Sequence, residues 1–235
     1  MATPKADVIA GLLSLYRDPR YLEVGVAGGR TFHGLTAARK VAVDPRFKFD
    51  IEEAKAGQPA ASYHQVQSDE YFGCLVESGE RFDVIYLDGL HTFEQTLRDL
   101  FNAIRYLAPS GVIVVDDVVP SSYFASLREL AQFHAVRKGR KDISDAWMGD
   151  VYRLVFFIET FFQQFTYRTI SDNLGQLVVW PERRPAVRER TVEATARAPY
   201  ESVLLERDAF RLAPFASILE EVRAWLAAAG SGKAV

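Results

Sequence analysis

The sequence predicts an α/β fold in which helices cover both faces of an open, mainly parallel sheet. Short apolar segments alternate with segments of helical spacing along the chain. Residues 82–87 and 111–115 are almost continuously apolar, as expected for strands that are covered on both faces. A glycine-rich turn at residues 25–29 separates the first strand from the segment that follows it. We therefore expect right-handed crossovers between parallel strands.

Length and composition favour one globular domain over residues 1–235. The chain is 49% apolar and 25% charged, and its net charge of −3 offers no basic surface for nucleic acid. Its one cysteine, Cys74, excludes an intramolecular disulfide and a cysteine-based metal cluster. The start of the sequence has no signal-peptide pattern, and no apolar run is long enough to span a bilayer. We expect a cytoplasmic protein without nucleic-acid or membrane partners.

The first half, about residues 15–117, is expected to form the ligand-binding core. Its first strand begins at Tyr21 and stops before Gly25. A helix precedes this strand in the sequence, and Asp18 and Pro19 break the chain between them. Later strands are expected over residues 40–43, 62–66, 82–87 and 111–115, and helices over residues 5–15, 31–39, 51–56, 71–77 and 92–107.

The second half changes its pattern after residue 117. Residues 118–149 are expected to be an inserted lid or substrate segment, with a helix over residues 121–134 and a polar stretch at 137–145 that could equally be a solvated connector. Residues 150–229 should add C-terminal strands and a closing helix. Here we expect helices over residues 147–162 and 214–229, strands over 165–170 and 176–180, and disorder over 230–235.

Acidic residues follow or end most of the predicted strands. Because the carboxyl ends of parallel strands meet at one edge of a sheet, these side chains should share a crevice. Like charges that are gathered in one place repel unless a cation or a donor-rich ligand is present, so the pattern favours a binding site. The residues concerned are Glu23, Asp44, Asp69 with its neighbour Ser68, Asp88, Asp116 and Asp117.

Three stretches of the first half resemble class I S-adenosylmethionine-dependent methyltransferases, and within them small O-methyltransferases. EVGVAGG at residues 23–29 looks like their glycine-rich first motif. FDVIYLDGLH at residues 82–91 and LAPSGVIVVDD at 107–117 look like their fourth and fifth strand motifs. The resemblance covers the first half well and the tail only in outline. It implies a Rossmann-like, seven-strand sheet that is mainly parallel and has an antiparallel final strand.

The resemblance implies S-adenosylmethionine as the cofactor. Asp44 falls where the family holds the ribose hydroxyls, and a carboxylate can accept two hydroxyl hydrogen bonds. The glycine spacing does not match the G-x-G-x-x-G cradle of a pyrophosphate, which favours methyl transfer over hydride transfer, although Arg46 beside Asp44 leaves a nucleotide dehydrogenase open. The expected cofactor-binding residues are Glu23, Gly25, Gly28, Gly29, Asp44, Ser68, Asp69 and Asp88.

The same resemblance implies a divalent metal and a histidine base. Catechol-type enzymes bind Mg²⁺ through acids at the ends of the fourth and fifth strands, and carboxylate oxygens are the ligands that this ion prefers. Asp88, Asp116 and Asp117 take those positions, with Asp117 where the catechol-type group usually has asparagine. His91 resembles the base of a D-x-x-H pattern, and an imidazole is suited to remove a hydroxyl proton near neutral pH.

The predicted reaction is methyl transfer from S-adenosylmethionine to a hydroxyl of a small molecule, catalysed with Asp88 and His91. Alternatives are a metal-free O- or N-methyltransferase and a non-catalytic nucleotide-binding module. Asp88 could also simply cap the helix that begins near Thr92. The apolar termini could support a homodimer, and no side chain in the sequence identifies the methyl acceptor.

Overall fold

The computed structural model describes residues 2–140, 146–185 and 188–231. They form one sheet of eight strands in the order β3-β2-β1-β4-β5-β7-β6-β8. Neighbouring strands are parallel except β7, which is antiparallel to both β5 and β6. The strands are β1 (Arg20–Val24), β2 (Arg39–Val43), β3 (Ala61–His64), β4 (Phe82–Leu87), β5 (Leu107–Val115), β6 (Thr166–Ile170), β7 (Leu177–Trp180) and β8 (Leu212–Ala213).

The strand register aligns the carboxyl ends of the central strands. Val24 of β1 pairs with Val43 of β2 and with Leu87 of β4, and Leu87 pairs in turn with Val115 of β5. The next residue of each strand therefore lies at the same edge of the sheet. The chain order also reverses here, because β2 and β4 lie on opposite sides of β1. Ligands of open α/β sheets bind at such a switch point.

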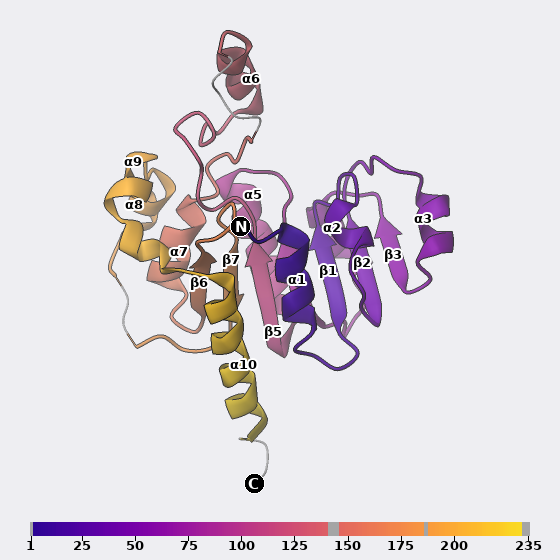
Figure 1. Cartoon of the computed structure of the whole chain (residues 1–235). Helices are drawn as coiled ribbons and strands as arrows, with labels where there is room; N and C mark the ends of the chain where they lie inside the picture. Colours follow the sequence, from indigo (N-terminus) through magenta and orange to yellow (C-terminus); the bar gives the residue numbers. More distant parts are fainter. Residues whose placement is uncertain (1, 141–145, 186–187, 232–235) are drawn as a thin grey trace.

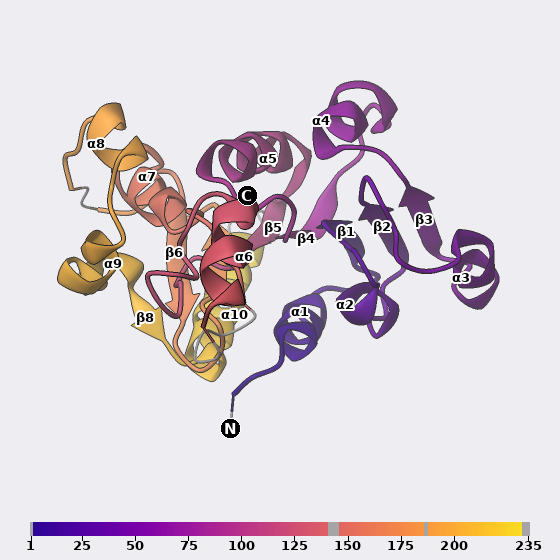
Figure 2. The same cartoon turned by 90° about the horizontal axis from the view of Figure 1, so that it is seen from above.

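Helices cover both faces of the sheet (Figure 2). One face carries α1 (Lys5–Leu13), α2 (Arg30–His33) and α10 (Phe215–Ser231), and the other carries α5 (Phe93–Tyr106) and α7 (Arg153–Phe161). Alternate strand residues supply the two cores, with Tyr86 on the α1 side and Leu87 on the α5 side. Strands with two buried faces explain the continuous apolar runs in the sequence.

The remaining helices lie at an edge of the sheet, above it, or on the face that carries α5 (Figure 2). They are α3 (Ile51–Gly57), α4 (Ser68–Glu70), a π-helix (Tyr71–Leu75), α6 (Leu130–Lys138), α8 (Val192–Ala196), α9 (Glu201–Leu205) and a short 3₁₀ helix (Arg207–Phe210). Helix α6 stands away from the sheet at the top of Figure 1. Among the described residues, no helix combines the length and the apolar character needed to cross a membrane.

The predicted α/β fold is confirmed, with three differences. The sheet has eight strands rather than seven because the two-residue β8 pairs with β6. The helix predicted over residues 31–39 ends at His33, since the buried Lys40 ammonium binds the carbonyl oxygens of Phe32 and Leu35 at 2.9 and 2.8 Å. The helix predicted over 71–77 is a π-helix that continues directly from α4.

The second half differs more from the predictions. Residues 121–128 form turns instead of a helix, and α6 begins only at Leu130. The reason is tertiary: the Ala125 carbonyl accepts hydrogen bonds from Met148 and Gly149 at 2.9 and 3.0 Å. The helix predicted from residue 147 begins at Arg153. Of the segment predicted to be disordered, residues 230–231 belong to α10 and 232–235 lie outside the described residues, as do 141–145 of the polar stretch.

Candidate active site

The glycine turn after β1 joins the ends of three strands. Gly25 has a φ of +90°, which a residue with a side chain rarely adopts, and a Cβ there would lie only 1.9 Å from the carbonyl oxygen of Asp88. The Gly25 N–H donates to the Val43 carbonyl at 2.9 Å. The turn after β1 therefore packs directly against the segments that follow β2 and β4, and only glycine allows this approach.

Asp44 organises the same turn from the end of β2. Its carboxylate accepts the backbone N–H of Ala27 at 2.8 Å and that of Arg46 at 2.7 Å. Ala27 has a φ of +47°, a left-handed conformation that this hydrogen bond helps to hold. A carboxylate offers about four acceptor positions, so Asp44 can accept further hydrogen bonds from a ligand.

A cavity of about 590 Å³ opens beside these residues at the carboxyl ends of the strands. Its volume is typical of a small-molecule site. Its wall includes Gly25 and Asp44, which follow β1 and β2, and Asp88 and His91, which follow β4. The polar or turn residues of the lining are Lys5, Gly25, Asp44, Gln67, Ser68, Asp88, Gly89, His91, Gln95 and Asp99.

Several residues that the sequence predicts for cofactor binding lie outside this lining. Glu23 is buried inside the sheet, where it accepts the Tyr21 hydroxyl at 2.6 Å. Burial raises the pKa of Glu23 to about 8; the Tyr21 hydrogen bond opposes this rise, and the charge of Asp88 adds to it. Asp69 forms an ion pair with Arg98 at 3.3 Å and accepts a hydrogen bond from the cavity residue Gln95 at 3.3 Å. Gly28 and Gly29 belong to the turn rather than to the wall of the cavity.

Helix α5 supplies cavity residues that the sequence analysis missed. Asp99 is only 2% exposed, and burial raises the pKa of its carboxyl group. Gln95 lies one helical turn earlier and donates to Asp99 at 3.1 Å and to Ser68 at 3.2 Å. The sequence held one signal for Asp99: this acid belongs to the helical stripe of α5 that also contains the buried Thr96, Leu100 and Ala103. Such a buried acid indicates a polar site rather than a solvated face.

Three carboxylates gather at the ends of β4 and β5, as predicted. The Tyr86 hydroxyl donates to Asp116 at 2.7 Å and lies 3.2 Å from Asp88. Asp117 follows in a left-handed conformation with a φ of +60°, so its side chain diverges from that of Asp116. Burial and the charges of Asp88 and Asp117 raise the pKa of Asp116 well above its ordinary value. Asp116 therefore holds a proton more strongly than a free carboxyl group, because its neighbours repel a further negative charge.

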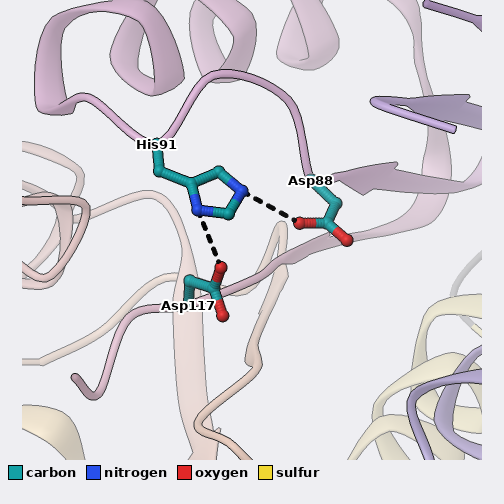
Figure 3. Close-up of side chains that lie close together, drawn as sticks. All are labelled: Asp88, His91 and Asp117. Atoms are coloured by element: carbon teal, nitrogen blue, oxygen red, sulfur yellow. Dashed lines mark ion pairs between the residues drawn. The ribbon is translucent and has the colours of Figure 1, made fainter. Parts of the chain in front are cut away.

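His91 bridges two of these carboxylates (Figure 3). Its Nδ1 lies 2.9 Å from the carbonyl oxygen of Trp147 and 3.1 Å from Asp117, and its Nε2 lies 3.5 Å from Asp88. A carbonyl can only accept, so Nδ1 carries a proton and Nε2 faces Asp88. Burial lowers the pKa of His91, but Asp88 and Asp117 outweigh it and raise the value to about 9.

The insertion contributes to the site through Trp147 and Gly149. The Trp147 ring stacks on His91 with centroids 5.1 Å apart and planes 14° from parallel. A Cβ at Gly149 would lie 1.7 Å from the His91 carbonyl oxygen. Asp150 accepts the N–H of Phe93 at 2.7 Å and so caps α5, a role that the alternative interpretation gave to Asp88.

The chemistry of the cluster fits a hard divalent cation. Ligand atoms of Asp88, His91 and Asp117 all lie within 4.8 Å of one another, and oxygen donors suit Mg²⁺ or Mn²⁺. Asp116, the third predicted ligand, instead binds the ammonium of Lys5, a residue the sequence analysis had treated only as the start of a helix. One carboxylate oxygen of Asp116, Oδ1, is buried without a partner among the described residues.

Comparisons with known proteins address the fold and the family. Residues 22–118 match a family model described as "Methyltransferase domain". This stretch begins in β1, ends just after β5, and contains the glycine turn and the carboxylate cluster. No curated protein matches the sequence.

Solved structures support the fold at low sequence identity. The O-methyltransferase TomG from Streptomyces achromogenes, involved in tomaymycin synthesis and solved with SAM, is 18% identical, with a TM-score of 0.52 over 77% of this chain and 81% of its own. An O-methyltransferase from Bacillus cereus solved with SAH is 15% identical, with a TM-score of 0.51 over 77% of this chain and 83% of its own. These likenesses confirm the predicted class I methyltransferase fold.

Proposed function

We propose that the chain, whose residues 22–118 match a methyltransferase-domain family model, transfers a methyl group from S-adenosylmethionine to a hydroxyl oxygen of a small molecule. One observation carries the proposal: the same cavity is lined by Gly25 and Asp44 on the cofactor side and by Asp88 and His91 on the other. A methyl donor and an acceptor that both lie in this cavity would be held close together, and proximity supplies much of the rate of such a transfer.

The cofactor would extend from the glycine turn toward α5. Asp44 would accept the ribose hydroxyls, because its carboxylate already faces the cavity with both oxygens oriented by backbone N–H groups. Ser68, Gln95 and Asp99 would bind the adenine, which offers an amino donor and ring-nitrogen acceptors. Bound S-adenosylmethionine supplies a methyl group activated by its sulfonium. Nearby carboxylates favour that positive charge.

The acceptor would lie beside Asp88 and His91. We assign His91 as the base because the Trp147 carbonyl holds the proton on Nδ1. Nε2 is then the nitrogen that would take up a hydroxyl proton, once it has lost the proton that Asp88 and Asp117 favour there. Trp147 would fix the orientation of the imidazole by stacking on it. Asp88 would orient the acceptor hydroxyl.

A divalent cation would be held by Asp88, Asp116 and Asp117. Its chemistry there would be that of a Lewis acid, which makes a bound hydroxyl more acidic. A metal-free transfer is the second candidate, and it is favoured by a specific observation: the Lys5 ammonium already places a positive charge among the same three carboxylates.

The test is turnover with methyl-labelled S-adenosylmethionine and a panel of phenols, catechols and sugars. The proposal predicts label in at least one hydroxyl product, with activity lost in His91→Gln while binding of S-adenosylhomocysteine persists. Repeating the assay with a chelator distinguishes the metal-dependent from the metal-free reaction. Label found on nitrogen, or full activity in His91→Gln, would contradict the proposed acceptor or base.

A further inference from the structure

The first residue of α1 reaches into the carboxylate cluster. The Lys5 ammonium forms its shortest contact with Asp116, and it lies 3.8 Å from Asp88 and 4.0 Å from Asp117. One side chain thus contacts all three carboxylates proposed as metal ligands, from a helix about 80 residues or more away in sequence. In Figure 1, α1 lies in front of the sheet with the N-terminus at the level of the strand ends.

Packing and hydrogen bonds hold Lys5 in this place. Val8, Ile9 and Leu12 of α1 are completely buried against the sheet and α10. On the other side of Lys5, the Thr3 N–H and hydroxyl bind the backbone and the carboxylate of Asp172 at 2.7 and 2.8 Å. Because the chain is fixed on both sides, the lysine enters the cluster from an anchored backbone.

The charges of the cluster explain why a cation is held there. Three carboxylates are in contact with two groups that can be positive, Lys5 and His91. The ammonium lies where oxygens of all three carboxylates converge.

We propose that Lys5 is the resident cation of this site, and that a divalent ion binds to Asp88, Asp116 and Asp117 only by displacing its ammonium. The inference rests on the divalent-ion site of the proposed function. Two cations cannot share the same oxygens at close range without strong repulsion. Metal binding is therefore coupled to the position of the Lys5 side chain, and the metal-free protein keeps a positive charge at the site.

The decisive experiment is calorimetric titration of Mn²⁺ into wild type and Lys5→Met. The variant should bind Mn²⁺ about tenfold more tightly or better, because the competing charge is gone while the carboxylates remain. Lys55→Met is the matched control: Lys55 pairs with Glu52 at 2.8 Å on α3, at the far edge of the sheet, and its removal should leave Mn²⁺ affinity unchanged. Equal affinity in wild type and Lys5→Met, or binding to neither, would overturn the proposal.

Two further measurements keep the test independent of folding and of the proposed reaction. Lys5→Gln repeats the titration with a polar side chain. In wild type at saturating Mn²⁺, the acetylation of Lys5, followed by peptide mass spectrometry, should become faster relative to that of Lys55. An unchanged ratio of the two acetylation rates would contradict displacement.

S-adenosylhomocysteine binding by the same samples is tested separately: its absence would remove the methyltransferase proposal, whereas unchanged Mn²⁺ affinity would remove only the role of Lys5.

Discussion

The two sides of the cavity are built in different ways. The proposed cofactor side, after β1 and β2, depends on main-chain geometry: Gly25 approaches Asp88 closely, and Asp44 is positioned by two backbone N–H groups. The proposed acceptor side, after β4 and β5, depends on charged side chains. It combines the carboxylates with Lys5 from α1 and Trp147 from the insertion.

This difference determines how each side should respond to change. Where two backbone segments pack directly against each other, there is no room for an added side-chain atom. Substitutions on the cofactor side should therefore affect folding as well as binding. Charged groups exchange protons and ions, so changes on the acceptor side should appear as dependence on pH and metal. The following predictions test this contrast.

The largest effect is expected for Gly25→Ala. The new Cβ would clash with the Asp88 carbonyl oxygen at 1.9 Å in a backbone conformation of φ +90°. We expect a loss of about 3 kcal/mol or more in the free energy of unfolding, measured by urea denaturation. Gly28→Ala is the matched control, because a Cβ at Gly28 meets no atom within 4 Å. Equal stability of the two variants would show that the close approach is not required.

An intermediate effect is expected for Asp44→Ala on cofactor binding. Removing the carboxylate takes away the acceptor of the Ala27 and Arg46 N–H groups and the proposed ribose contact. The affinity for S-adenosylhomocysteine, measured by calorimetry, should fall by about 10- to 100-fold. This loss corresponds to the free energy that a hydrogen bond to a charged group contributes.

Asp69→Ala serves as the comparison for Asp44→Ala. Asp69 also follows a strand of the cofactor side, but its side chain pairs with Arg98 outside the cavity lining. Its removal should leave the affinity within about threefold of wild type. A loss as large as that of Asp44→Ala would instead support the adenine contact that the sequence predicted for Asp69.

The smallest effect is a pH dependence of stability at His91. In the metal-free protein the folded-state pKa is about 9, above the ordinary value of 6.5, because Asp88 and Asp117 outweigh burial. His91 therefore contributes stability fully below about pH 6.5, and this contribution disappears as the pH rises through 9. Wild type should be more stable than His91→Gln, and this difference in unfolding free energy should be larger by roughly 2 kcal/mol at about pH 6.5 than at about pH 9.

The control for this prediction is His134→Gln, since His134 is exposed on α6. It should leave the pH dependence of urea denaturation as it is in wild type. If the difference in unfolding free energy between wild type and His91→Gln stays constant, or grows as the pH rises, the carboxylates do not hold a proton on His91.

The cofactor side was largely predictable because its signals are local. The continuous apolar run of β4 was predicted with its observed bounds of Phe82–Leu87, and the glycine turn and Asp44 follow directly from strand ends. The carboxylates of β4 and β5 were also predictable, since parallel strands bring their ends together. Asp69 lies outside the lining of the cavity, whereas its neighbours Gln67 and Ser68 and the more distant Asp99 belong to it, so the cofactor contact of Asp69 stays a prediction.

The acceptor side was only partly predictable because its contacts connect distant parts of the chain. Lys5 looks like an ordinary first residue of an amphipathic helix, and no local pattern shows that it reaches Asp116. The predicted helix over residues 121–134 failed for the same reason. Ala125 and Arg128 bind Met148 and Asp150 across the insertion, and these tertiary contacts override helical spacing.

The most direct test of the central claim is calorimetric titration of S-adenosylhomocysteine into the wild-type protein. The claim is that the cavity at the ends of β1, β2 and β4 is a methyl-donor site. It predicts saturable binding of one molecule per chain, abolished or strongly weakened by Asp44→Ala. A sample that unfolds cooperatively on heating, and is therefore folded, but releases no heat of binding would contradict it.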